Sequence, residues 1–178
     1  MGRAIAIANQ KGGVGKTTTA INLSACLAAK RKKVLVIDMD PQGNTTSGFG
    51  VEKNELENTV YELILGECSV EECLIKNVVK NVSIIPSNVN LAAAEIELIG
   101  VDKKEYILKN EIDWIRDQYD FIIIDCPPSL SMLTNQCDDD SGYSSCSDSV
   151  RILCAGGIES ADPYRKSGKR TSESDSGY

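Results

Sequence analysis

The chain has 178 residues, which suits one domain of ordinary size and is short for two. Its 19 Lys and Arg against 26 Asp and Glu give a formal net charge of -7, which excludes a polycation that binds nucleic acid through overall charge. With no histidine, histidine triads and histidine metal sites are excluded as well. No apolar run approaches the roughly 18 residues of a membrane-spanning helix, so no membrane partner is expected.

The seven cysteines form no CxxC pair. Cysteines without such spacing in an acidic chain of this size fit a reducing compartment better than a disulfide scaffold. We therefore expect a cytoplasmic protein in which the early cysteines are small core residues.

The chain changes character near residue 135. Residues 1–135 are predicted to form a globular domain, and residues 136–178 are called the tail here. The tail has ten serines and only four residues of the types Val, Ile, Leu and Phe. Such a composition buries too little apolar surface to offset the entropy of ordering, so the tail is expected to be largely disordered.

Apolar runs alternate with helical patterns along residues 1–135. Continuous apolar runs, typical of strands buried on both faces of a parallel sheet, occur at Arg3–Ala8, Lys33–Asp38, Asn81–Pro86 and Asp120–Asp125. Helical spacing occurs at Thr17–Lys30, Tyr61–Gly66, Leu91–Ile99 and Lys103–Gln118, where Tyr106 and Trp114 are expected to pack in the core. This order predicts an α/β fold with a doubly wound, mostly parallel sheet of the P-loop NTPase type.

A glycine-rich string, NQKGGVGKTT at residues 9–18, stands between the first strand and the first helix. Its three glycines let backbone N–H groups turn toward an anion, and the helix that follows points its positive N-terminus at the same place. The string predicts a polyphosphate site in which Lys16 contacts the β and γ phosphates and Thr17 holds Mg²⁺. Thr18 is expected to cap the helix or contact the α phosphate. The alternative is a glycine-rich surface turn that carries two lysines.

The form KGGVGKTT resembles the deviant phosphate loop of the ParA, MinD and nitrogenase iron-protein superfamily. The general pattern GxxxxGK[ST] is not met, because residue 10 is Gln, and a lysine precedes the paired glycines instead. The resemblance implies an ATP-sandwich dimer in which Lys11 reaches the partner's nucleotide. The predicted nucleotide-binding residues are Lys11, Gly12, Gly13, Val14, Gly15, Lys16, Thr17 and Thr18.

Two aspartates, Asp38 and Asp125, end predicted parallel strands, whose carboxyl ends meet at the ligand-binding edge of an open α/β sheet. The strings that follow them, DMDPQGN and DCPPSLS, resemble the switch I and Walker B regions of ParA/Soj proteins. This resemblance implies that Asp40 orients or activates the attacking water and that Asp125 binds Mg²⁺ through water. The predicted metal set is Thr17, Asp38 and Asp125, and the predicted catalytic set is Lys11, Lys16 and Asp40. Alternatively, Asp38 and Asp125 merely cap the turns after their strands.

The resemblance implies a Mg²⁺-dependent ATPase of chromosome or plasmid partitioning, with ATP and Mg²⁺ as cofactors. Its expected partners are a second copy of the chain, a ParB-like stimulating protein and non-specific DNA. DNA binding is doubtful for this chain, because the basic surface used by the family is not visible in its tail. The run KRKK at residues 30–33 is interpreted as the solvated end of a helix. Two alternatives stay open: a non-enzymatic remnant with weak nucleotide binding, and a MinD-like ATPase, which would need a C-terminal amphipathic helix.

The tail is predicted to be an out-of-frame reading, which would leave the family fold truncated. With synonymous codons free, the genetic code lets residues 150–178 be read in a shifted frame as CEYYALEGLSQLIHTVSLVKERLNPTLD. That string resembles ParA/Soj sequences at this point of the chain. A four-base tandem duplication near Asn135 would produce the shift.

Overall fold

The computed structural model describes residues 2–9, 11–99, 107–128 and 151–155. Within these ranges the strands form a six-stranded sheet in the order β3-β4-β2-β5-β1-β6. Its four inner strands are parallel: β4 (Val82–Ile85), β2 (Val34–Asp38), β5 (Phe121–Asp125) and β1 (Arg3–Ala8). The edge strands β3 (Ile75–Val79) and β6 (Arg151–Ala155) are antiparallel to their neighbours.

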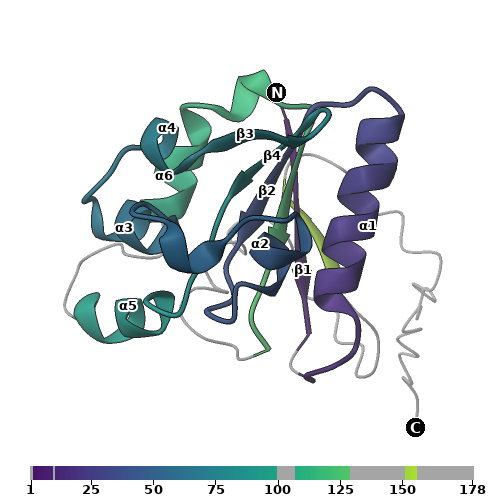
Figure 1. The fold of residues 1–178 in the computed structure, drawn as a ribbon. Helices are drawn as coiled ribbons and strands as arrows, with labels where there is room; N and C mark the ends of the chain where they lie inside the picture. The colour runs from purple at the N-terminus through teal and green to yellow at the C-terminus, as the bar shows by residue number, and fades with distance from the viewer. Residues whose placement is uncertain (1, 10, 100–106, 129–150, 156–178) are drawn as a thin grey trace, which may run out of the picture.

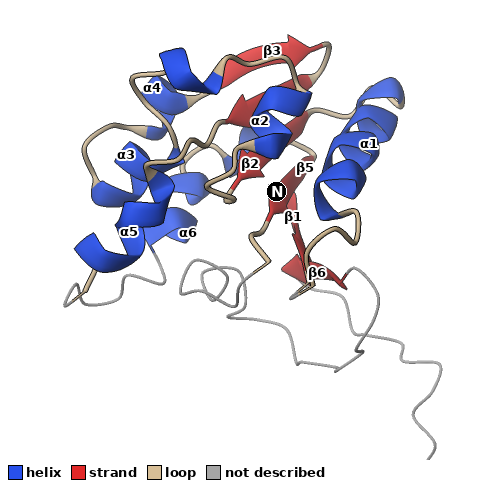
Figure 2. Cartoon of the chain, turned by 60° about the horizontal axis from the view of Figure 1, so that its bottom comes forward, coloured by secondary structure: helices blue, strands red, loops and turns tan. Residues whose placement is uncertain are grey.

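Helices cover both faces of the sheet, which confirms the doubly wound architecture (Figures 1 and 2). One face packs against α1 (Lys16–Ala29). The other face carries α3 (Val60–Leu65), α4 (Val70–Cys73), α5 (Leu91–Glu97) and α6 (Ile107–Asp113). The short helix α2 (Asn44–Gly48) follows β2, and two 3-10 turns lie at Lys53–Glu55 and Arg116–Gln118.

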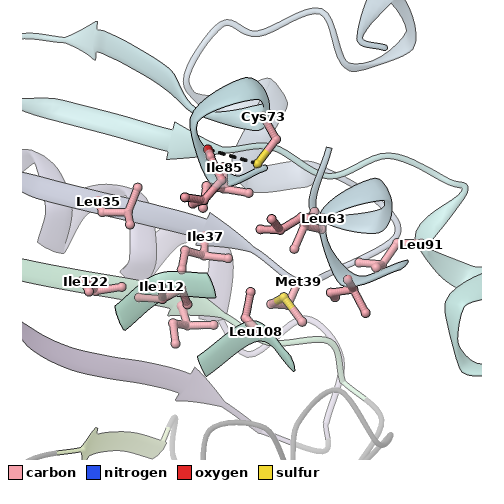
Figure 3. Packing of buried hydrophobic residues seen from close by; sticks show 14 of the residues in the cluster. Leu35, Ile37, Met39, Leu63, Cys73, Ile85, Leu91, Leu108, Ile112 and Ile122 are labelled. Carbon is pink, nitrogen blue, oxygen red and sulfur yellow. Dashed lines mark hydrogen bonds between the residues drawn. The ribbon is translucent and has the colours of Figure 1, made fainter. Parts of the chain in front are cut away.

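The strand β2 shows why these runs are apolar throughout. All five of its residues are buried, with Val34 and Val36 packed on the α1 side and Leu35 and Ile37 on the opposite side. A strand covered on both faces has no solvent side that would favour polar residues. The side opposite α1 holds the larger cluster (Figure 3), in which Leu35, Ile37 and Ile122 meet Leu63, Leu91, Leu108 and Ile112 from the helices.

Two sequence expectations about side chains are wrong. Trp114 is 81% exposed, because α6 ends at Asp113 and the next core position is taken by Ile115. Cys26 is exposed, because it lies on the outer side of α1, whereas Ala20 and Ser24 face the sheet. Cys73 and Cys126 are buried as expected. Tyr106 lies outside the described residues.

Five residues of the tail form β6, which pairs with β1 from Ala4↔Ala155 to Ala8↔Arg151. The strand contains two of the tail's four residues of the types Val, Ile, Leu and Phe, and a third, Val150, directly precedes it. The edge of β1 offers backbone N–H and C=O groups for such a strand. The prediction of low order for the rest of residues 136–178 falls outside the described residues.

No helix in the described ranges is long and apolar enough to cross a membrane.

Candidate functional site

The loop between β1 and α1 adopts a conformation that needs glycine at two positions. Gly13 has φ +73° and Gly15 has φ +89°, both in the left-handed region that side chains with a Cβ rarely adopt. A Cβ built on either residue, or on Gly12, would find no atom within 4 Å. The Cβ positions of these three glycines therefore face space that the described part of the chain leaves open.

The N-terminus of α1 leaves its backbone donors unused. Gly15 is the N-cap, and no side chain caps the helix. The N–H groups of Gly12, Gly13, Val14 and Gly15 donate to no backbone acceptor among the described residues. The first helical N–H groups, those of residues 16–18, have no partner inside the helix either, because the first such bond runs from Thr19 to Gly15 O at 2.8 Å. Free amides at the positive end of a helix dipole favour an anion.

The two loop lysines occupy different environments. Lys16 is 8% exposed, and its charge acts on the carboxylate of Asp125, whose pKa it lowers as a minor contribution. Lys11 is exposed; its backbone N–H donates to Asn9 Oδ1 at 2.8 Å, and its ammonium forms no salt bridge with the residues that the structure describes. A role for Lys11 at a partner's nucleotide stays a prediction, because it needs a second chain.

Asp125 ends β5 and is 1% exposed. Its Oδ2 accepts two hydrogen bonds, from Thr17 Oγ1 at 2.8 Å and from Thr45 Oγ1 at 2.6 Å. Its Oδ1 is buried and has no hydrogen-bond partner among the described residues. Burial raises the pKa of Asp125; the bonds from Thr45 and Thr17 oppose this rise, and the negative charge of Asp40 adds to it.

Asp38 lies opposite Asp125 in the register of β2 and β5. Unlike Asp125, it uses both oxygens: Oδ2 accepts the N–H and the hydroxyl of Thr46, each at 2.8 Å, and Oδ1 accepts the N–H of Asp40 at 3.1 Å. Burial raises the pKa of Asp38 to about 6 against these hydrogen bonds, and the charge of Asp125 adds to the rise. The predicted role of Asp38 as a metal ligand stays a prediction, and direct coordination would require one of these contacts to open.

Asp40 lies half-buried at the start of the turn that leads into α2. Its backbone C=O accepts the N–H of Gly43 at 2.8 Å, and its Oδ1 accepts the N–H of Gln42 at 2.9 Å. Its charge is close enough to raise the pKa of Asp125. The structure thus brings Asp40 to the same corner as Lys16, Thr17, Asp38 and Asp125, while its predicted role toward water stays a prediction.

The oxygen atoms in this corner fit Mg²⁺. Thr17 commits its one hydroxyl proton to Asp125, so Oγ1 presents only lone pairs to any further group. Asp125 Oδ1 is a buried acceptor without a donor. Hard oxygen ligands of this kind suit Mg²⁺, which is usually held by one or two protein groups together with water and phosphate. The described residues contain no cluster of three or more His, Cys, Asp or Glu that could hold a metal ion.

Thr45, Thr46 and Ser87 contribute to this corner and were not predicted from the sequence. Thr45 and Thr46 are fully buried on α2. The N–H of Ser87, two residues after β4, donates to Thr46 Oγ1 at 2.9 Å. Gly43, with φ +58°, brings α2 so close that a Cβ there would lie 2.8 Å from Ser87 O. The sequence signal was the threonine pair directly after the DPQGN turn, but it does not identify the partners.

A strand, a glycine loop with free amides, a helix, and two buried aspartates at neighbouring strand ends define a P-loop type of nucleotide-binding α/β protein. Residues 2–143 match the AAA domain family AAA_31, and the chain belongs to this family. It is 51% identical over 134 residues to the sporulation initiation inhibitor protein Soj of Bacillus subtilis, an alignment that covers 75% of this chain and 53% of that protein. The resemblance to ParA/Soj proteins is therefore confirmed over the first three quarters of the chain. The chain spans about half the length of the curated relatives it matches.

Solved structures show the same fold. A plasmid partition protein from Borrelia burgdorferi superposes with a TM-score of 0.70 at 35% identity, over 76% of this chain and 61% of that one. A cobyrinic acid a,c-diamide synthase from Mycobacterium smegmatis, with bound ATP analog and magnesium, superposes with a TM-score of 0.74 at 38% identity, over 76% of this chain and 55% of that one. Both likenesses, each over 76% of this chain, support the P-loop architecture.

Proposed function

We propose that this chain is a Mg²⁺-dependent ATPase of the ParA/Soj type that acts in chromosome or plasmid partitioning and hydrolyses ATP in a nucleotide-sandwich dimer. The proposal rests on two features of one site. The loop amides have no backbone acceptor among the described residues, and Oδ1 of Asp125, next to Thr17, has no donor. The similarity to Soj supports the partitioning role, and the M. smegmatis structure with ATP analog and magnesium supports the cofactors.

In this proposal the amides of residues 12–18 and the ammonium of Lys16 bind the phosphates and neutralise their charge. Thr17 and Asp125 would hold Mg²⁺, which supplies further positive charge to the phosphates when bound. Asp40 orients the attacking water. Phosphoryl transfer needs mainly such positioning and charge stabilisation, so this small set of groups suffices.

The remaining proposed contacts come from outside the chain. Lys11 is exposed at the mouth of the loop, where a second copy of the chain would bring its nucleotide within reach. A ParB-like protein would stimulate hydrolysis, and DNA is a further partner proposed from the family alone. These contacts rest on the resemblance, because the chain spans about half the length of its relatives.

ATP turnover by the purified chain tests the proposal. Lys16→Ala is expected to lower the rate by at least about 100-fold, as loss of a group that stabilises transition-state charge does. Lys30→Ala, at the other end of α1, is the matched control and is expected to keep the rate. A rate that does not respond to Lys16→Ala, or no turnover by a folded chain, would favour the non-enzymatic alternative.

A further inference from the structure

The two oxygens of Asp125 have opposite environments, and this asymmetry has a structural origin. Oδ2 accepts hydroxyl groups from two different segments: Thr17 on α1 and Thr45 on α2. Oδ1 accepts none, although the residue is 1% exposed. A buried acceptor without a donor costs free energy, and a cation that binds to it is one way in which that cost is offset.

Two donors on one oxygen hold a carboxylate in one orientation. The 2.8 Å bond from Thr17 alone would leave the group free to rotate about this contact, whereas the 2.6 Å bond from Thr45 fixes a second direction. With Oδ2 held from both sides, Oδ1 stays the free oxygen. Thr45 is separated from the phosphate loop in sequence and is linked to the site by its hydrogen bond to Asp125.

The neighbouring threonine makes a different set of contacts. Thr46 donates its N–H and its hydroxyl to Asp38 and accepts the N–H of Ser87, so it ties α2 to β2 and to the end of β4. Together with the N–H of Asp40, these bonds use both oxygens of Asp38. The side chain of Thr45 instead donates one hydrogen bond, to the aspartate whose Oδ1 has no hydrogen-bond partner among the described residues.

We propose that Thr45 is a positioning residue that sets the affinity of the site for Mg²⁺ by holding Asp125 with Oδ1 available. The inference rests on the proposed function, since it concerns the same aspartate. It adds α2 to the metal site, because the helix after the DPQGN turn is hydrogen-bonded to the carboxylate that would help to hold the cation. The helix is therefore expected to become more rigid when Mg²⁺ is bound with nucleotide.

A Mg²⁺ titration of nucleotide binding tests Thr45 directly. A fluorescent N-methylanthraniloyl derivative of ATP is bound to the full chain, first in EDTA and then with increasing Mg²⁺. Thr45→Val, which keeps the shape and removes the donor, is expected to raise the half-saturating Mg²⁺ concentration about tenfold, the size of a hydrogen bond to a charged group. Its affinity in EDTA is expected to be unchanged. Thr45→Ser keeps the donor and should stay within about twofold of the unmodified chain, as should Ser47→Ala on the exposed side of α2.

The outcomes separate this inference from the proposed function. If the unmodified chain binds no nucleotide, both are overturned. If it binds with Mg²⁺ and Thr45→Val titrates like the unmodified chain, or if Thr45→Val loses affinity equally in EDTA, only the role of Thr45 is overturned. Should Thr45→Val fail to fold, hydrogen exchange of the unmodified chain decides: adding Mg²⁺ to the nucleotide complex should slow exchange in residues 44–48, and unchanged exchange there would overturn the inference.

Discussion

The helices α1 and α3 begin in opposite ways, although each has the same set of unpaired N–H groups to satisfy. At α3, Thr59 Oγ1 accepts the N–H of Tyr61 at 3.2 Å, and the carboxylate of Glu62 accepts both the N–H and the hydroxyl of Thr59 at 2.7 Å. At α1, Gly15 offers no side chain to cap the helix, and the N–H groups of residues 12–18 have no backbone acceptor among the described residues. The first arrangement completes a helix within the chain, and the second leaves positive charge density for a ligand.

The capped solution is repeated at α4, where Ser69 and Glu72 form the same reciprocal pair. Capping residues are thus used at two helices of four and six residues, whereas the 14-residue helix α1 does without one. The uncapped start of α1 is in line with the proposed binding role of the loop, and the packing of α1 on the sheet stabilises the helix.

Adding a methyl group to the phosphate loop is expected to have the largest effect on nucleotide affinity. Gly15→Ala would leave the fold nearly intact, because its Cβ meets nothing and the strain of φ +89° costs about 1–2 kcal/mol. A residue with a Cβ at this left-handed position would also disturb the loop whose N–H groups are proposed to bind phosphate, so nucleotide affinity is expected to fall at least about 100-fold. Calorimetric titration with ATP measures this.

Gly50→Ala is the matched control, since Gly50 has φ +78° and equally open surroundings outside the loop. It carries the same strain and should bind nucleotide normally. Equal affinity of both variants would contradict the assignment of the loop as the phosphate site.

The buried carboxylate of Asp38 and the capping carboxylate of Glu72 should make the free energy of unfolding depend on pH with opposite signs. The pKa of Asp38 rises from 3.8 unfolded to about 6 folded, so its contribution to stability is complete below pH 3.8 and is lost as pH rises through 6. Asp38→Asn is expected to remove up to about 3 kcal/mol of this decline between pH 4 and 7. Urea unfolding without nucleotide and Mg²⁺ measures it.

The pKa of Glu72 is lowered by the backbone and side-chain hydrogen bonds of Ser69, so its contribution is present above pH 4.5 and is lost as pH falls. Glu72→Gln should therefore weaken the chain more at pH 6 than at pH 3. If the difference in unfolding free energy between Asp38→Asn and the unmodified chain did not change with pH, the burial of an ionisable Asp38 would be contradicted.

Removing the cap at the start of α3 should lower the free energy of unfolding and leave nucleotide affinity unchanged. Thr59→Ala deletes the side chain that accepts from Tyr61 and donates to Glu62, and it is expected to cost about 1–2 kcal/mol of unfolding free energy. Nucleotide affinity should not change, since α3 lies on the face of the sheet opposite α1. A loss of nucleotide binding in a folded Thr59→Ala chain would show that the two helix starts are not independent.

Much of the site could be predicted because its signals are local in sequence. The string KGGVGKTT fixes the strand-loop-helix arrangement, and the Asp at the end of each apolar run places Asp38 and Asp125 together, since parallel strands share an edge. Thr45 could not be assigned in this way, because its partner is 80 residues away and is reached only after β2 and β5 pair. Trp114 was misplaced because the helical period continues in the sequence past the point where α6 ends.

The out-of-frame origin of the tail stays a prediction, since no contact in the structure depends on codons. Sequencing the gene decides it: a duplicated four-base repeat near the codon for Asn135 is expected, and its absence would end the idea.

Amide chemical shifts followed by NMR during a titration with ATP and Mg²⁺ test the central claim most directly, because they report on both helix starts at once. The claim predicts large shifts for the amides of residues 12–18 and none for the capped amides of Thr59 and Tyr61. Unchanged amides in residues 12–18 at saturating ATP, in a chain that is folded, would contradict it.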